Sequence, residues 1–129
     1  MIVGVGIDLV EVARIQRALE NSKTGLRLRN RIFTEKEIQY CEGKHQGKYQ
    51  SYAGRFAAKE AVMKALGRGW GSQVAWLGIE ILPGPGGKPE VRLSNKTSAF
   101  ADQLGITQCA LSITHTESYA MATVVAAQG

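Results

Sequence analysis

The sequence predicts a single α+β domain in which a mostly antiparallel sheet packs on a long central helix. Helical patterns cluster in the first half of the 129 residues, while short β-segments and turns dominate the second half. Helices and strands that occupy separate parts of a chain favour the α+β class. No repeat, low-complexity stretch or linker divides the sequence, so we expect residues 1–129 to share one hydrophobic core.

Two elements are predicted near the N-terminus. Residues 2–9 form an apolar run with valine and isoleucine and predict a buried strand. This run lacks a basic region and a small-residue cleavage site, so a strand is favoured over a signal peptide. Residues 11–21 follow as an amphipathic helix, because Val12, Ile15 and Leu19 recur at helical spacing.

Capping signals define two further helices. Thr34 is the expected N-cap of a second helix, and Glu37 occupies the reciprocal position of a capping box. Residues 50–67 are rich in alanine and predict the longest helix, which Gly67 is well placed to end. Lys59 falls in the middle of the apolar stripe of this helix. Its charge either marks a functional site or stays in water at the end of a packed stem, and both interpretations remain open.

The second half predicts a hairpin, a short helix and a second pair of strands. In chain order these are strands at 76–82 and 89–93 joined by a turn at 83–87, a helix at 95–104, and strands at 108–114 and 119–127 separated by a turn at 115–118. With 44% hydrophobic and 21% charged residues, the chain has the composition of a folded protein. No apolar run approaches the ~20 residues needed to cross a bilayer, so no membrane association is expected.

Cysteine usage indicates the compartment. The only cysteines are Cys41 and Cys109, and no C-x-x-C is present. This pattern excludes a disulfide framework and a zinc site of the usual spacing. We therefore expect a reducing, cytoplasmic location in which both thiols serve only in packing.

One segment carries the whole excess of positive charge, which is +5 for the chain. From Arg14 to Arg31 there are six basic residues and one acid, whereas the remainder holds ten of each. We call residues 14–31 the basic segment. It predicts a docking surface for an acidic partner, with a solvated helix face as the alternative.

Several common motifs are missing. The pair Gly4 and Gly6 could begin a dinucleotide fingerprint, but Leu9 stands where the third glycine is needed. We therefore expect the two glycines to permit close packing of the first strand. No G-x-S-x-G elbow supports a hydrolase, and no Walker loop supports an NTPase.

Two carboxylates are candidate site residues. Asp8 has two interpretations: it caps the following helix in an Asp8-x-x-Glu11 capping box, or it binds Mg²⁺ as a hard oxygen ligand. Glu60 and Lys64 are spaced i,i+4 on one helix face, which is ordinarily the spacing of a surface ion pair. Alanines flank this pair, and this indicates that the face lies close to other protein.

The segment Ser112–Thr116 also has two interpretations. Its histidine and the flanking hydroxyls offer hydrogen-bond donors for a phosphate. Alternatively, the hydroxyls satisfy their own backbone in a hairpin turn. The residue types alone are compatible with either role.

Taken together, five segments resemble the holo-acyl-carrier-protein synthases, the short-chain class of 4′-phosphopantetheinyl transferases. They occur in the family's order and are Gly6–Arg14, Phe33–Glu37, Ala53–Gly67, Gly87–Pro89 and Ser112–Thr116. The block Gly-Arg-Phe-Ala-Ala-Lys-Glu-Ala in the third segment is highly specific, whereas Gly-Lys-Pro alone would be weak. The resemblance covers nearly the whole chain.

The resemblance implies an activity and a catalytic set. The family transfers the phosphopantetheine arm of coenzyme A to a serine of acyl carrier protein, in fatty acid biosynthesis, and releases adenosine 3′,5′-bisphosphate. Asp8 and Glu60 match the family's metal-binding carboxylates, which hold Mg²⁺, and Lys64 is expected to contact the same phosphates. Glu60 is also the candidate acceptor of the serine proton, either directly or through a metal-bound water.

The resemblance further implies binding residues and an assembly. Arg55, His115 and Thr116 match positions that grip the 3′-phosphate region of coenzyme A, and Ser112 and Lys64 complete the expected cofactor-binding set. The short class assembles as a homotrimer with coenzyme A bound between neighbours. Within the basic segment, the residues expected to bind the acidic carrier protein are Arg14, Arg17, Arg27 and Arg31.

One position departs from the wider superfamily, and two other classes of function remain. Larger members carry a third acidic ligand two residues after the first aspartate, where this chain has Val10, so the metal is expected to rely more on water. A nucleic-acid-binding module would use the basic segment, but nine scattered aromatic residues give no stacking platform. A catalytically silent scaffold of the same fold is the second alternative.

Overall fold

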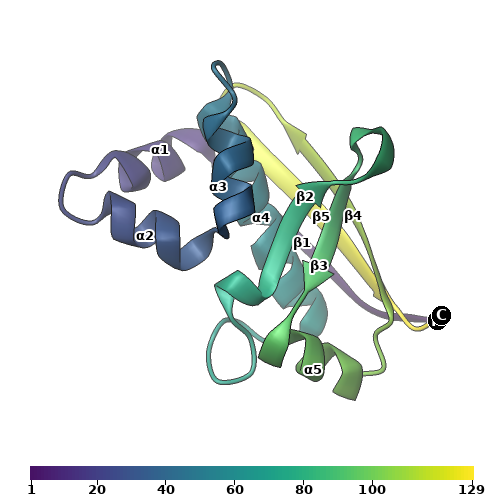
Figure 1. Ribbon diagram of the computed structural model, residues 1–129. Coiled ribbons are helices and arrows are strands. Elements are labelled where there is room, and N and C mark those ends of the chain that lie inside the picture. The colour runs from purple at the N-terminus through teal and green to yellow at the C-terminus, as the bar shows by residue number, and fades with distance from the viewer.

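The structure, a computed structural model, describes residues 1–129 and confirms the α+β class (Figure 1). The helices are α1 (Val12–Glu20), α2 (Gly25–Ile32), α3 (Glu35–Glu42), α4 (Lys48–Leu66) and α5 (Asn95–Gln103). The strands are β1 (Ile2–Glu11), β2 (Ile79–Pro83), β3 (Pro89–Leu93), β4 (Gln108–His115) and β5 (Tyr119–Ala127). None of the helices combines the length and the hydropathy that a membrane span requires.

The strands form two antiparallel sheets where the sequence predicted one. The larger sheet has the order β1-β5-β4, and the smaller is the β2-β3 hairpin. In the larger sheet Asp8 pairs with Ala122 of β5, and Ala122 pairs in turn with Ile113 of β4. Both β1 and β4 are therefore edge strands, and Asp8 lies on one of the two edges.

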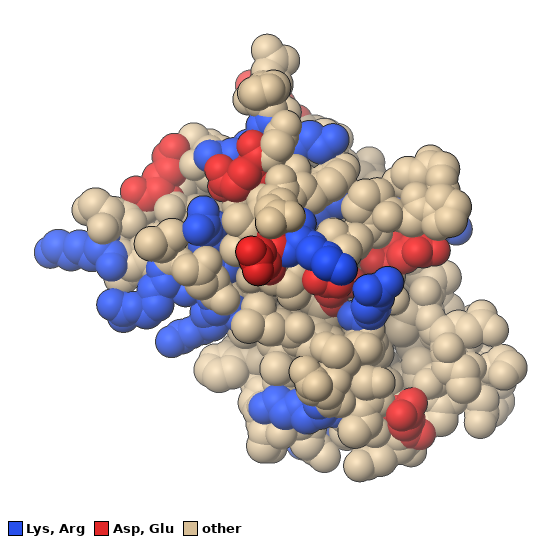
Figure 2. All heavy atoms as spheres, in the orientation of Figure 1, with Lys and Arg blue, Asp and Glu red and all other residues tan.

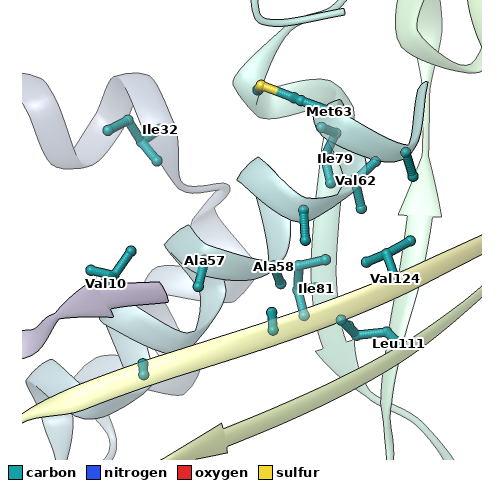
Figure 3. Close-up of a cluster of buried hydrophobic side chains, with 14 of the residues drawn as sticks. Val10, Ile32, Ala57, Ala58, Val62, Met63, Ile79, Ile81, Leu111 and Val124 are labelled. Atoms are coloured by element: carbon teal, nitrogen blue, oxygen red, sulfur yellow. The ribbon is translucent and has the colours of Figure 1, made fainter. Parts of the chain in front are cut away.

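Helix α4 packs across one face of the larger sheet and forms the centre of the core. Twelve of its 19 residues are buried, and the apolar stripe predicted for it is present. Figure 3 shows Ala58 and Val62 of this helix among side chains from β2 and from the larger sheet. Gly67 ends the helix as predicted, with a positive φ of 79° that a glycine adopts without strain.

Gly4 and Gly6 allow β1 to lie directly against α4. A Cβ atom added at Gly4 would overlap the backbone carbonyl of Ala65, and one added at Gly6 would overlap that of Ala61. The sequence prediction that these glycines serve close packing is thus confirmed. The contact brings the backbone of the edge strand next to the last two turns of α4.

A buried ion pair joins α3, α4 and the small sheet. The ammonium of Lys59 lies 2.8 Å from Glu37 Oε1, and both side chains are fully buried. Lys59 also donates to the carbonyl oxygens of Trp76, at 3.0 Å, and of Ile79. Glu37 accepts from the backbone N–H of Thr34 and of Ile81, each at 2.8 Å. Burial lowers the pKa of Lys59, and the charge of Glu37 opposes that effect.

This arrangement decides two sequence predictions. The capping box of Thr34 and Glu37 is present, so that prediction is confirmed. The ammonium of Lys59 does not reach water, so the interpretation with a solvated charge is wrong. The Glu37 carboxylate caps α3 and neutralises Lys59 at once, which explains why a lysine is tolerated inside the apolar stripe.

Three parts of the chain differ in structure from the prediction. Strand β1 continues to Glu11, which becomes the N-cap of α1 without a side-chain cap bond, so the Asp8-x-x-Glu11 capping box is wrong. Residues 76–78 form a short 3₁₀ helix, because the carbonyl of Trp76 accepts the N–H of Ile79 and the Lys59 ammonium. Helix α2 was not predicted, since it lacks a capping side chain and an acid in its first turn.

Replacing Glu37 with alanine is expected to lower the free energy of unfolding by about 3–5 kcal/mol, because the Lys59 ammonium would stay buried without its counter-charge. Urea denaturation at one fixed protein concentration measures this loss. Glu11→Ala is the control, since Glu11 forms an exposed ion pair with Arg17 at 3.8 Å. That variant should lose at most about 1 kcal/mol. Equal losses of unfolding free energy in the two variants would show that the buried ion pair stabilises the fold no more than the exposed one.

Candidate active site

A cluster of two carboxylates and a lysine lies where β1 meets α4; we call Asp8, Glu60 and Lys64 the acidic cluster. Lys64 Nζ lies 3.2 Å from Asp8 Oδ1 and donates to the carbonyl of Ile7 at 2.9 Å. The Asp8 side chain is 17% exposed and that of Lys64 is 52% exposed, so the cluster opens to solvent. The three predicted catalytic residues are thus brought together by the contact of β1 with α4.

The electrostatics of the cluster favour a bound cation. Burial raises the pKa of Glu60, the nearby Asp8 carboxylate raises it further, and Lys64 and Arg14 oppose the shift. Lys64 forms its ion pair with Asp8 across the two elements. The two carboxylates still repel each other, because Asp8 raises the pKa of Glu60, and a divalent ion between the two would relieve this repulsion.

The residues present fit Mg²⁺. The donors are hard carboxylate oxygens, and no group of three or more His, Cys, Asp or Glu side chains surrounds a common point anywhere in the chain. Magnesium keeps several waters and is commonly held by one or two carboxylates together with substrate phosphates. Val10 occupies the position at which a third acidic ligand was considered in the sequence analysis, and its side chain is buried in the core. The assignment of Asp8 and Glu60 to Mg²⁺ stays a prediction.

A second site lies on the other side of α4, in a groove of about 460 Å³. Its lining residues include Tyr40, Lys44, Arg55, Pro83, Gly87 and His115, and we call it the Arg55 groove. Arg55 Nη1 lies 3.3 Å from Ser51 Oγ, and the guanidinium carbon lies 4.1 Å from the centre of the Tyr40 ring. Arg55 Nε is buried without a hydrogen-bond partner. Lys44, Arg55 and His115 therefore line one groove.

The remaining predicted cofactor residues lie outside this groove. Thr116 Oγ1 accepts the backbone N–H groups of Ser118 and Tyr119, at 3.2 and 3.0 Å, so it stabilises the β4–β5 turn. Ser112 is exposed on the face of β4 opposite to Ile113 and His115, because side chains alternate along a strand. Within one chain, only Arg55 and His115 of the predicted 3′-phosphate residues share a groove.

The acidic cluster and the Arg55 groove lie on opposite flanks of α4. At about 100° per residue, Arg55 is displaced by about 140° from Glu60 and about 180° from Lys64 around the helix axis. The axial separation is roughly 8–14 Å at 1.5 Å per residue. The body of α4 and the sheet beneath it separate the two sites, so one small ligand cannot reach both directly in a single chain.

The basic segment is largely a free surface. Arg14, Arg17, Arg27 and Arg31 are all exposed, as predicted. Figure 2 shows the Lys and Arg side chains gathering over α1 and α2, to the left of the view. Arg29 is the exception, since it is half-buried and lies 3.9 Å from Glu42. Because Arg14 also influences the pKa of Glu60, this basic surface adjoins the acidic cluster.

Sequence reasoning missed Tyr40 and Lys44. Tyr40 lies in the last turn of α3, and Lys44 follows in the loop where no signal was found. Their i,i+4 spacing is the only local indication that the two side chains are in contact. The contact of Tyr40 with Arg55 depends on the packing of α3 against α4, which cannot be predicted from a local sequence pattern.

These features together define a group transferase that acts on phosphate-bearing substrates. A carboxylate pair with an adjacent lysine suits phosphoryl chemistry, where neutralisation of charge matters more than covalent help. The chain belongs to the 4′-phosphopantetheinyl transferase superfamily, whose family model matches residues 4–124, and within it to the holo-[acyl-carrier-protein] synthases.

Individual relatives agree over nearly the full length. The holo-[acyl-carrier-protein] synthase of Ruminiclostridium cellulolyticum is 50% identical over 97% of this chain and 92% of its own. The crystal structure of the Neisseria meningitidis enzyme matches with a TM-score of 0.88 and 35% identity, covering 99% of this chain and 100% of that one. The Helicobacter pylori enzyme, solved in complex with coenzyme A, matches with a TM-score of 0.82 and 32% identity, covering 95% and 99%.

Replacing Gly6 with alanine is expected to destabilise the fold by about 1–3 kcal/mol, because the added methyl group must push β1 away from α4. Thermal and urea unfolding measure the change. Gly69→Ala is the matched control, since a Cβ atom added at Gly69 meets no atom within 4 Å. If both variants unfold at the wild-type midpoint, the close contact of β1 and α4 does not determine the fold.

Proposed function

We propose that this chain transfers the 4′-phosphopantetheine group of coenzyme A to a serine of apo acyl carrier protein, giving holo acyl carrier protein and adenosine 3′,5′-bisphosphate. The observation that carries the proposal is the acidic cluster of Asp8, Glu60 and Lys64, which lies within the residues 4–124 that match the family model. Curated relatives at 41–50% identity bear the name of this activity. A solved relative was crystallised with coenzyme A.

In this proposal the chain's own residues position and neutralise the reacting groups. Asp8 and Glu60 would hold Mg²⁺, which would supply charge neutralisation at the pyrophosphate. The ammonium of Lys64 lies beside Asp8 and is exposed, so it is available to contact phosphate oxygens.

The proton balance assigns a role to Glu60. The serine oxygen forms a bond to the pyrophosphate phosphorus that carries the pantetheine arm. The bond from that phosphorus to the bridging oxygen breaks, and the electron pair leaves with adenosine 3′,5′-bisphosphate. The serine proton goes to Glu60, directly or through a water. Burial raises the pKa of this carboxylate, which makes it a better proton acceptor than an exposed glutamate.

The uncovered face of the larger sheet supports contact with other copies of the chain, which we propose to assemble as a homotrimer. Four apolar side chains of β1 point away from α4 and are 40–62% exposed: Val3, Val5, Ile7 and Leu9. A contiguous apolar face of this kind marks a protein interface. The separation of the two sites by α4 points the same way, since a cofactor would reach the acidic cluster of one chain and the Arg55 groove of its neighbour. In this assembly Ser112 also lies on the interface side.

The basic surface is proposed to bind the carrier protein, which is acidic, in the cytoplasm as part of fatty acid biosynthesis. Complementary charge speeds encounter and fixes orientation more than it deepens affinity. The position of this surface beside Glu60 would deliver the partner's serine to the reacting phosphate. A nucleic-acid module or a silent scaffold would show no transfer to apo carrier protein in a mass-spectrometric assay.

Asp8→Ala and Glu60→Ala should each lower turnover by at least about 100-fold, because each removes half of the proposed metal site. Transfer to apo carrier protein, followed by mass spectrometry with saturating Mg²⁺ and coenzyme A, measures this. Asp102→Ala, at an exposed acid on α5, serves as the control and should keep wild-type turnover. Near wild-type activity in either site variant, with an intact circular dichroism spectrum, would remove that residue from the site.

Arg14→Glu and Arg27→Glu are expected to raise the KM for carrier protein severalfold and to leave the KM for coenzyme A nearly unchanged. Exposed charge pairs are screened over ~8–10 Å at physiological ionic strength, so the wild-type KM for carrier protein should also rise with salt. Arg92→Glu, an exposed charge reversal on β3, is the matched control. A KM for carrier protein that does not depend on salt would contradict this prediction. Weakened binding of coenzyme A in the two variants would instead indicate that the basic segment binds the cofactor.

A further inference from the structure

Helix α2 has one charged residue on its inner face. Its buried residues are Gly25 and Ile32. At about 100° per residue, Arg29 lies within roughly 40° of Gly25 around the helix axis, whereas Arg27 and Arg31 are each displaced by about 160° from Arg29. Arg29 is accordingly half-buried, and the other two arginines are exposed. The inner arginine therefore faces the domain while the outer two face a partner.

Few contacts hold α2 in place. The helix has only eight residues, no side-chain cap and no acid in its first turn. Helices this short are marginal in water and depend on tertiary packing. At its start, a Cβ atom added at Gly25 would overlap the carbonyl of Leu19 in α1, and at its end Ile32 packs in the core. The contacts of Arg29 are therefore a substantial part of what orients α2 between these two ends.

The partner of Arg29 is Glu42, in the last turn of α3. Arg29 Nη1 lies 3.9 Å from Glu42 Oε2, and no other acid lies within 4.0 Å of the guanidinium. The Nε atom of Arg29 is buried without a hydrogen-bond partner. The attraction to Glu42 is therefore the main polar contact of this side chain.

The carboxylate of Glu42 is itself held by α4. The hydroxyl of Tyr52 donates to it at 2.7 Å, and Lys48 Nζ lies 3.3 Å from its other oxygen. Tyr52 is buried, and its ring lies edge-on to that of Phe33 with 4.9 Å between the centres. The hydrogen bond from Tyr52 lowers the pKa of Glu42, as does Lys48, while burial opposes the shift. Helix α4 thus fixes a negative charge to which Arg29 is drawn.

We propose that Glu42 is a positioning residue for docking of the carrier protein: it holds Arg29 on the inner face of α2 and so directs Arg27 and Arg31 toward the acidic partner. This inference rests on the proposed function. It predicts an effect opposite in sign to that of charge alone. Removing a negative charge near the basic segment should by itself favour an acidic partner. Weaker docking after neutralisation of Glu42 would therefore come from a displaced α2.

The test measures steady-state transfer by Glu42→Gln, which removes the charge and keeps an oxygen that can accept the Tyr52 hydroxyl. The KM for carrier protein should rise about 2- to 5-fold, the range expected for loss of one partly exposed ion pair. The turnover number and the KM for coenzyme A should stay nearly unchanged. Glu35→Gln removes an exposed acid of the same helix and is the matched control, whose KM for carrier protein should be unchanged or slightly lower.

A double-mutant cycle shows whether Glu42 acts through Arg29. In an Arg29→Gln background, Glu42→Gln should have no further effect on the KM for carrier protein, because the interaction is already lost. A KM for carrier protein that is unchanged or lowered in Glu42→Gln would overturn the inference and leave the proposed function standing. A rise in both KM values, or the same rise in the Arg29→Gln background, would also overturn it. A wild-type chain that transfers nothing to apo carrier protein would overturn the proposed function and the inference with it.

Discussion

The direct contact between strand β1 and helix α4 is the constraint on which the rest of the structure depends. Gly4 and Gly6 leave no room for a side chain against the carbonyls of Ala65 and Ala61, so the two backbones touch. The consequence is chemical, because Asp8 on the strand then lies within 3.2 Å of Lys64 on the helix and influences the pKa of Glu60. A wider gap, filled by ordinary side chains, would separate these charges.

The faces of helix α4 have separate roles. Its buried face forms the core and carries Lys59, whose ion pair with Glu37 fixes the β2-β3 hairpin to the domain. One flank carries Glu60 and Lys64 beside β1. The other flank carries Arg55, which faces a groove whose far wall is the tip of that same hairpin. Stability and the proposed function therefore depend on different residues of one helix, and the buried ion pair links the two by holding the hairpin in place.

The sequence predicted a structural feature correctly where the physical cause of that feature is a local pattern of residues. The capping box of Thr34 and Glu37, the end of α4 at Gly67 and the exposure of the basic segment followed from spacing and charge alone. Questions that depend on contacts between distant segments stayed open or were wrong. The partner of Lys59, the place of Asp8 inside a strand and the separation of Arg55 from Glu60 all required the tertiary packing. The family resemblance named the site residues, but only the structure divides them between two flanks of α4.

The central claim is that the acidic cluster and the Arg55 groove are two halves of one site completed between neighbouring copies of the chain. A crystal structure with Mn²⁺ and coenzyme A tests it most directly, since the anomalous signal of manganese locates the metal. We expect manganese at Asp8 and Glu60, the pyrophosphate beside Lys64, and the 3′-phosphate of the same cofactor at Arg55 of a neighbouring copy. Manganese bound elsewhere, or a cofactor held at both ends by a single chain, would contradict it.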